Sequence, residues 1–171
     1  MGLNRRRFLL GAATVCVARH STLAAVAFFP AWARVPAITV FGTANDPRVP
    51  LVHDAVAFWN KAFTHIGSGF RLGPVSVSGG SIPQGALVTM SQLVVGQHGL
   101  PPMPNWLSGR LGQIVVALSD DDFISFAMRW GETGLVAIKS VTAYPLTLPN
   151  VARNVIAHEL GHAICLGHRQ C

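Results

Sequence analysis

Charged residues are scarce in this sequence, at 12% of its 171 residues. Of the 13 lysines and arginines, Arg5, Arg6, Arg7 and Arg19 precede residue 34, whereas none of the seven acidic residues does. The remaining chain therefore has nine basic residues against seven acidic ones, a net charge of +2 rather than the +6 of the whole. So small a surplus gives no reason to expect a nucleic-acid partner.

Cysteine is scarce as well. After residue 33 the sequence has Cys165 and Cys171, both at its C-terminal end. Cysteines so placed exclude a small domain held together by disulfides. A disulfide between the two, zinc binding by a Cys165 thiolate and a pair of simple thiols all remain open. Internal repeats and low-complexity segments are absent, and the roughly 138 residues that follow residue 33 suffice for one domain.

The first 33 residues have the pattern of an export signal. A basic segment at residues 5–7 precedes Phe8 and Leu9, and an apolar, alanine-rich stretch follows. This pattern resembles the bacterial twin-arginine signal, and a general secretory signal or an uncleaved anchor are the alternatives. The stretch is too short and interrupted for a membrane span. The A-x-A site at residues 31–33 predicts cleavage after Ala33, which leaves residues 34–171 as a periplasmic or extracellular domain.

Hydrophobic periodicity predicts the order of elements in that domain. An amphipathic helix is expected at residues 50–66, a short helix at 120–130, and a C-terminal helix from 151 to about 164 with Asn150 as N-cap. β-branched and apolar runs predict strands at residues 37–42, 70–77, 86–95, 113–118 and 134–141. The pattern indicates an α+β domain built in layers.

The C-terminal helix carries the residues with the clearest chemistry. His158 and His162 are four residues apart, so they lie one turn apart on the same side of a helix and can point at one metal ion. Glu159, beside the first histidine, is placed to act as a general base toward a zinc-bound water. His168 supplies a third nitrogen if the chain turns out of the helix after His162, and Gly167 would permit such a turn.

Residues 158–168, HELGHAICLGH, closely resemble the metzincin signature H-E-x-x-H-x-x-G-x-x-H, in particular its matrixin form. The resemblance implies that His158, His162 and His168 are zinc ligands and that Glu159 is the catalytic base. It also implies a twisted, mostly parallel sheet packed on a long helix and an active-site helix. The signature glycine is replaced by Cys165, which predicts a strained turn or a break shifted toward Gly167.

Metzincins also have a methionine-bearing turn downstream of the third histidine. The sequence ends at Cys171, so the expectation is a truncated member that lacks this Met-turn subdomain. The predicted function is an exported zinc endopeptidase that hydrolyses internal peptide bonds through a zinc-activated water. The alternative is a non-catalytic remnant, a secreted domain that binds zinc or peptide without turnover.

The remaining expectations concern partners and further ligands. The expected partner is a protein or peptide substrate, added as a strand beside an exposed sheet edge for which residues 134–141 are the candidate. The protein is expected to be a monomer without nucleic acid and without a membrane span after signal removal. A calcium ion at residues 120–122 is an alternative to a solvated helix start. Surface positions are expected for His53, His65 and His98 rather than a second metal site.

Overall fold

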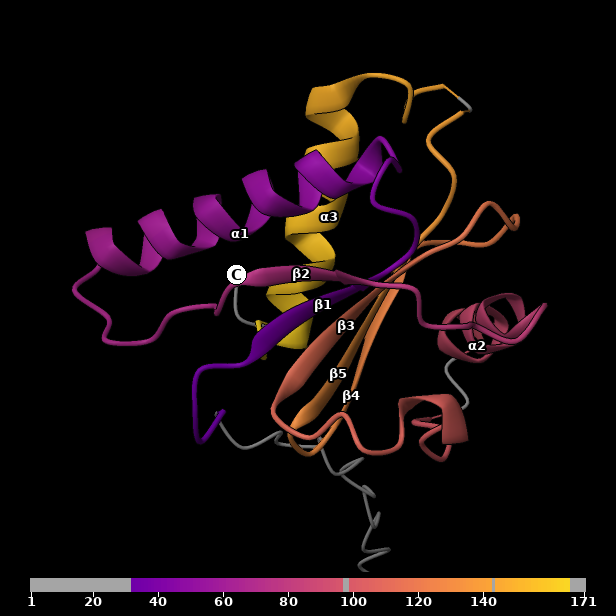
Figure 1. Cartoon of the computed structure of the whole chain (residues 1–171), viewed down its shortest axis with the longest axis horizontal. Helices are drawn as coiled ribbons and strands as arrows, with labels where there is room; N and C mark the ends of the chain where they lie inside the picture. The colour runs from indigo at the N-terminus through magenta and orange to yellow at the C-terminus, as the bar shows by residue number, and fades with distance from the viewer. Residues whose placement is uncertain (1–31, 97–98, 143, 167–171) are drawn as a thin grey trace, which may run out of the picture.

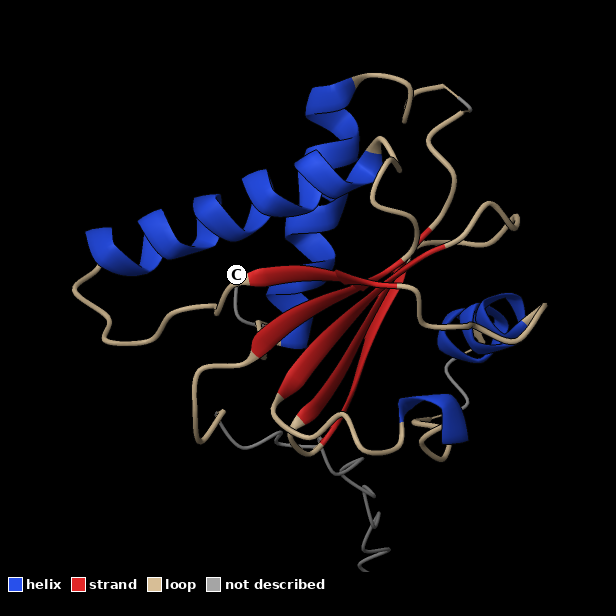
Figure 2. Cartoon of the chain, viewed as in Figure 1, coloured by secondary structure: helices blue, strands red, loops and turns tan. Residues whose placement is uncertain are grey.

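In the part of the chain that the structure describes, five strands form one twisted sheet, and three helices cover its two faces (Figures 1 and 2). The computed structural model describes residues 32–96, 99–142 and 144–166. Within them the elements are, in chain order, β1 (Ala37–Phe41), α1 (Arg48–His65), β2 (Val75–Ser78), α2 (Ala86–Val95), a 3-10 turn (Asn105–Leu107), β3 (Gln113–Leu118), β4 (Phe126–Trp130), β5 (Thr133–Ile138) and α3 (Pro149–Ala163).

The sheet is mostly parallel, which confirms the predicted α+β class and sheet type. Its strand order is β2-β1-β3-β5-β4. The first four of these strands run parallel, and β4 pairs antiparallel with β5 through a tight turn at Gly131. The apolar run of β3 is central and buried on both sides, as a continuous hydrophobic strand predicts.

The core has two halves, one on each face of the sheet. One half lies between the sheet and the helices α1 and α3, with Val40, Val116 and Leu160 among its members. The other half lies between the opposite face and α2, and contains Leu87 and Phe126. Figure 1 shows α1 and α3 on one side of the strands and α2 on the other. Side chains alternate between the halves along each strand, as the two-residue repeat of a strand requires.

Two predicted elements are wrong in type. Residues 86–95, predicted as a strand, form helix α2, which buries Leu87, Met90 and Ser91 at helical spacing. Residues 126–130, assigned to a short helix, form strand β4, where Phe126 and Met128 enter one half of the core while Ala127 packs against the other. Short apolar segments fit both periodicities, so packing against the sheet decides between them.

The predicted substrate edge is also wrong. Strand β5, which covers the start of the 134–141 candidate, lies between β3 and β4 and uses both of its edges for pairing. The ends of the described sheet are β2 and β4. The strand predicted at residues 70–77 begins only at Val75 and ends at Ser78, so it is shorter than predicted.

The first described residue, Trp32, belongs to the core. Its side chain is 7% exposed and packs in the half of the core beneath α1 and α3. The predicted cleavage after Ala33 would separate Trp32 from the domain. Among the helices of the described residues, none has the length and apolarity to cross a membrane.

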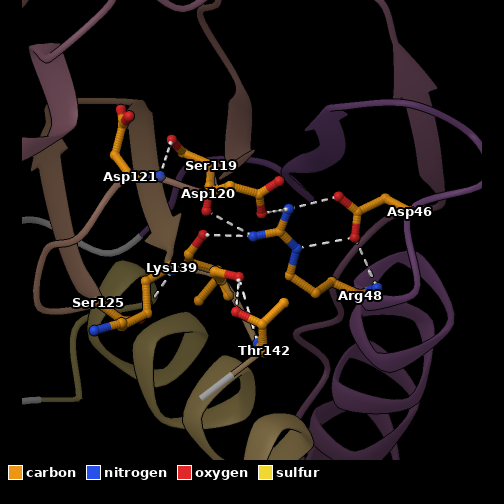
Figure 3. Close-up of polar contacts among 10 residues, drawn as sticks. Asp46, Arg48, Ser119, Asp120, Asp121, Ser125, Lys139 and Thr142 are labelled. Atoms are coloured by element: carbon orange, nitrogen blue, oxygen red, sulfur yellow. Dashed lines mark hydrogen bonds and ion pairs between the residues drawn. The ribbon is translucent and has the colours of Figure 1, made fainter. Parts of the chain in front are cut away.

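A buried arginine fastens the start of α1 to the sheet (Figure 3). The guanidinium of Arg48 donates two hydrogen bonds to the Asp46 carboxylate, at 2.9 and 2.6 Å, and one at 3.0 Å to Asp120. It also donates to the carbonyls of Ser119 and Ile138, at 2.7 and 3.4 Å, which lie where β3 and β5 end. One side chain therefore joins the long helix to two parallel strands.

Asp46→Asn should lower the free energy of unfolding by about 2 kcal/mol, because it leaves the Arg48 guanidinium buried with only Asp120 as a counter-charge. Burial alone would raise the pKa of Asp46, but its hydrogen bonds to Arg48 and the charge of Arg48 outweigh burial and hold the pKa below 3.8. This stabilisation is complete above the ordinary pKa and is lost as the pH falls through the lowered one. Urea unfolding from pH 7 down to pH 2 measures both effects.

Asp122→Asn is the matched control. Its carboxylate pairs with Lys139 at 2.9 Å, but the Asp122 side chain is 99% exposed, so solvent screens the pair and stability should change little. Equal losses in the two variants would show that the buried pair has no special role. A difference between wild type and Asp46→Asn that persists unchanged to pH 2 would contradict the lowered pKa.

Candidate metal centre

Helix α3 presents the two histidines because its other side is buried. Ile156 and Leu160 are fully buried against the sheet, while His158 is exposed and His162 is half-buried. The helix begins two residues earlier than predicted, at Pro149 after Leu148, and Asn150 is not its N-cap. Proline suits the first position of a helix because its fixed φ is helical and its missing N–H would have no partner there.

The imidazoles of His158 and His162 converge at their Nε2 atoms. These atoms are 3.0 Å apart, and the ring centroids lie 4.5 Å apart in an edge-to-face arrangement. Two nitrogens bound to one tetrahedral zinc ion, each at about 2.0–2.1 Å, would be separated by about 3.4 Å. Small rotations of the rings therefore suffice for both nitrogens to hold one ion.

A backbone carbonyl fixes the protonation of His162. Its Nδ1 lies 2.7 Å from the carbonyl oxygen of Leu166, which can only accept a hydrogen bond. Nδ1 therefore carries the proton, and the lone pair of the neutral ring is on Nε2, the atom that faces His158. A carbonyl that orients a histidine through its second nitrogen is a recurrent support of zinc ligands.

Helix α3 ends at Ala163, and the chain turns at Cys165, the position where the metzincin signature has glycine. Cys165 has φ of 80°, the left-handed conformation. The N–H groups of Leu166 and Cys165 donate to the carbonyls of Gly161 and His162, at 2.9 and 3.0 Å, which is the Schellman pattern of helix termination. The expected strain at Cys165 is present, but the predicted shift of the break toward Gly167 is wrong.

Glu159 lies on the buried side of α3. It is 7% exposed, and burial raises the pKa of its carboxyl group to about 7. It follows His158 directly in the sequence, so its side chain lies on a different face of the helix from that of His158. A carboxyl group with a pKa near neutrality exchanges protons readily at physiological pH, which suits a general base.

A close contact with α1 sets the position of α3. The indole N–H of Trp59 donates to the carbonyl of Ala157 at 2.7 Å, within the helix turn that holds His158. A Cβ atom on Gly161 would lie 3.0 Å from Cζ2 of Trp59. The glycine inside the HELGH segment therefore allows close packing, since a Cβ atom there would require the Trp59 ring to move by a few tenths of an ångström.

Two residues that the sequence did not single out hold the end of α3. Arg129 of β4 is 3% exposed, donates from Nη1 to the Cys165 sulfur, and stacks on the Trp32 ring at 4.4 Å. The Trp32 indole N–H donates at 3.0 Å to the carbonyl of Ala163, in the last turn of the helix. A lone arginine in a strand and a tryptophan next to an export signal give no sequence pattern by which to find this arrangement.

The third expected ligand, His168, lies outside the described residues, as do Gly167, Cys171 and His98. Within the described ranges no group of three or more His, Cys, Asp or Glu side chains is placed to hold a metal. The calcium site at residues 120–122 stays a prediction. In this segment Asp120 pairs with Arg48 and Asp122 pairs with Lys139. On α1, His53 and His65 are exposed, as expected.

Comparison of the chain with protein-family models, with curated proteins and with solved structures finds no match.

Replacing Cys165 by glycine or by alanine should separate backbone strain from loss of the thiol. Both variants lose the sulfur, but only alanine keeps a Cβ at φ of 80°. The glycine variant should be more stable by roughly 1 kcal/mol in urea unfolding. At Arg153, exposed in the interior of α3, the order should reverse, because alanine favours a helix by about 1 kcal/mol over glycine. The same order at both positions would exclude strain at Cys165.

Gly161→Ala should lower the free energy of unfolding by about 1–2 kcal/mol, because the new methyl group meets Trp59. Helix propensity alone would favour alanine by up to about 1 kcal/mol, so a loss can be assigned to the contact. Gly69→Ala is the control, since a Cβ there meets nothing within 4 Å. A gain in stability at position 161 would contradict the close packing of α1 on α3.

Proposed function

We propose that this protein is an exported zinc endopeptidase of the metzincin type. His158, His162 and His168 hold the zinc, and Glu159 is the general base. The observation that carries the proposal is the convergence of the His158 and His162 Nε2 atoms, 3.0 Å apart, with the Nδ1 proton of His162 held by the Leu166 carbonyl. This donor set suits zinc, which binds imidazole nitrogen readily in tetrahedral sites.

The turn at Cys165 supports the third ligand. A Schellman ending reverses the direction of the chain sharply after α3, so the residues that follow need not continue along the helix axis. His168 comes three residues after this turn. In the metzincin signature, the glycine that corresponds to Cys165 is the point where the helix breaks toward the third ligand.

The protein's own groups would divide the work of peptide hydrolysis. Zinc, when bound, would polarise the scissile carbonyl and acidify water. Glu159 would accept the proton from water and deliver it to the leaving amine. The buried side of α3 and its contact with Trp59 would keep the carboxyl group at a fixed distance from the histidines.

Strand β4 is the better candidate for the substrate-binding edge. It is a terminal strand of the described sheet, and α3 packs against both β4 and its neighbour β5. The other terminal strand, β2, packs against α1 instead. An extended peptide that pairs with β4 would therefore lie on the side of the sheet nearest to the histidines, with main-chain hydrogen bonds supplying much of its affinity.

Zinc content tests the ligand set. The exported full-length protein should bind one zinc ion, and His158→Gln, His162→Gln and His168→Gln should each weaken binding more than the roughly 10–100-fold that loss of a supporting hydrogen bond costs. Affinity is measured by competition with a chromophoric chelator. His65→Gln, at an exposed position on α1, is the matched control and should bind as wild type does. Unchanged affinity in His168→Gln would exclude the three-histidine site.

Cleavage of unfolded casein tests the enzyme. Glu159→Gln preserves the shape of the side chain but removes its basicity, so zinc should stay bound while the rate falls by about 10²–10⁴-fold. Zinc binding without cleavage that depends on Glu159 would support the alternative, a secreted zinc-binding domain without turnover. Cleavage that survives in Glu159→Gln would assign the activity to a contaminant or to another residue.

A further inference from the structure

Trp32 fills a defined place in the folded domain. Its ring packs over β5, where a Cβ on Gly134 would lie 3.5 Å from the ring atom Cζ2. The side chain is 7% exposed and belongs to the half of the core that also contains Ile156 and Leu160 of α3. The indole ring therefore packs against both the backbone of β5 and the buried face of α3.

The polar edge of Trp32 completes the end of α3. The last four carbonyls of a helix have no partner within the helix. One of them, the carbonyl of Ala163, accepts the indole N–H at 3.0 Å in a buried hydrogen bond. Without Trp32 this carbonyl, on the residue that follows His162 and two residues before Cys165, would remain in the interior without that donor.

The face of the Trp32 ring lies against a buried cation. Arg129 stacks on it at 4.4 Å and is itself 3% exposed. Among the described residues, the Arg129 Nη2 atom is buried and has no hydrogen-bond partner. The aromatic face therefore contributes a cation–π contact to this buried guanidinium.

Cleavage after Ala33 would remove all of these contacts. The sequence offers a second A-x-A site upstream, Ala25-Val26-Ala27, which would leave Phe28 as the first residue. Cleavage after Ala27 meets the same requirement for small residues and leaves Trp32 in the processed chain. We propose that the export signal is removed after Ala27, so that the processed chain begins at Phe28 and keeps Trp32 as a core residue.

The intact mass of the exported protein tests this inference. The full-length chain, expressed in a bacterial host and purified from outside the cytoplasm, should begin at Phe28. Ala27→Arg should stop processing, because the position before the cut requires a small residue. Ala33→Arg is the matched control: Ala33 is exposed in the domain, and processing should continue to yield Phe28 as the first residue.

Thermal unfolding of the processed protein tests the role of the side chain. Trp32→Ala should lower Tm by about 10 °C, and Trp32→Phe, which keeps a ring but loses the N–H donor, should lower it by less. Phe58→Ala is the control, since Phe58 is 55% exposed and its loss should have little effect. A Trp32→Ala variant as stable as Phe58→Ala would overturn the structural role of Trp32.

This inference rests on the proposed export and not on the zinc chemistry, and the outcomes separate the two. A stable exported chain that begins at Arg34, or whose processing is blocked by Ala33→Arg, would overturn the upstream site and leave export intact. A chain that stays uncut in the cytoplasm would overturn export as well. Neither result depends on the zinc and casein measurements.

Discussion

The close approach of α1 and α3 is the contact on which the candidate site depends most. Gly161 lets Trp59 lie against the helix, and the indole N–H binds the Ala157 carbonyl at 2.7 Å. Together with the burial of Ile156 and Leu160, this contact fixes the rotation of α3 about its axis. His158 and His162 lie on the other side of the helix, because the side that carries Ile156 and Leu160 is packed in the core. The orientation of the two histidines is therefore a consequence of core packing.

The end of α3 is held by one local contact and by two contacts from distant parts of the chain. The Leu166 carbonyl fixes the tautomer of His162, Trp32 occupies the Ala163 carbonyl, and Arg129 contacts the Cys165 sulfur. The contact of Trp32 uses a carbonyl that helix termination leaves without an internal partner, and that of Arg129 uses the residue that adopts the left-handed turn. The end of helix α3 and the orientation of His162 therefore depend on neighbouring contacts in this protein.

Two buried arginines account for much of the polar structure in a chain with few charges. Arg48 ties α1 to the ends of β3 and β5, and Arg129 ties β4 to the end of α3. Neither could be found from sequence patterns, because the partners of Arg48 at Ser119 and Ile138, and of Arg129 at Cys165, are distant along the chain. A buried cation can be recognised only once its acceptors and its aromatic neighbour are in place.

The sequence alone determined the α+β class, the central strand β3, the two helices α1 and α3, and the shared face of His158 and His162, because these depend on periodicity within one segment. Tertiary structure decided that residues 86–95 are helical, that residues 126–130 form an antiparallel edge strand, and that Cys165 adopts the left-handed turn. It also decided that Trp32 belongs to the core. The physical reason is the same in each case: short apolar segments and single polar side chains have several local conformations of similar energy, and only contacts made across the fold select one.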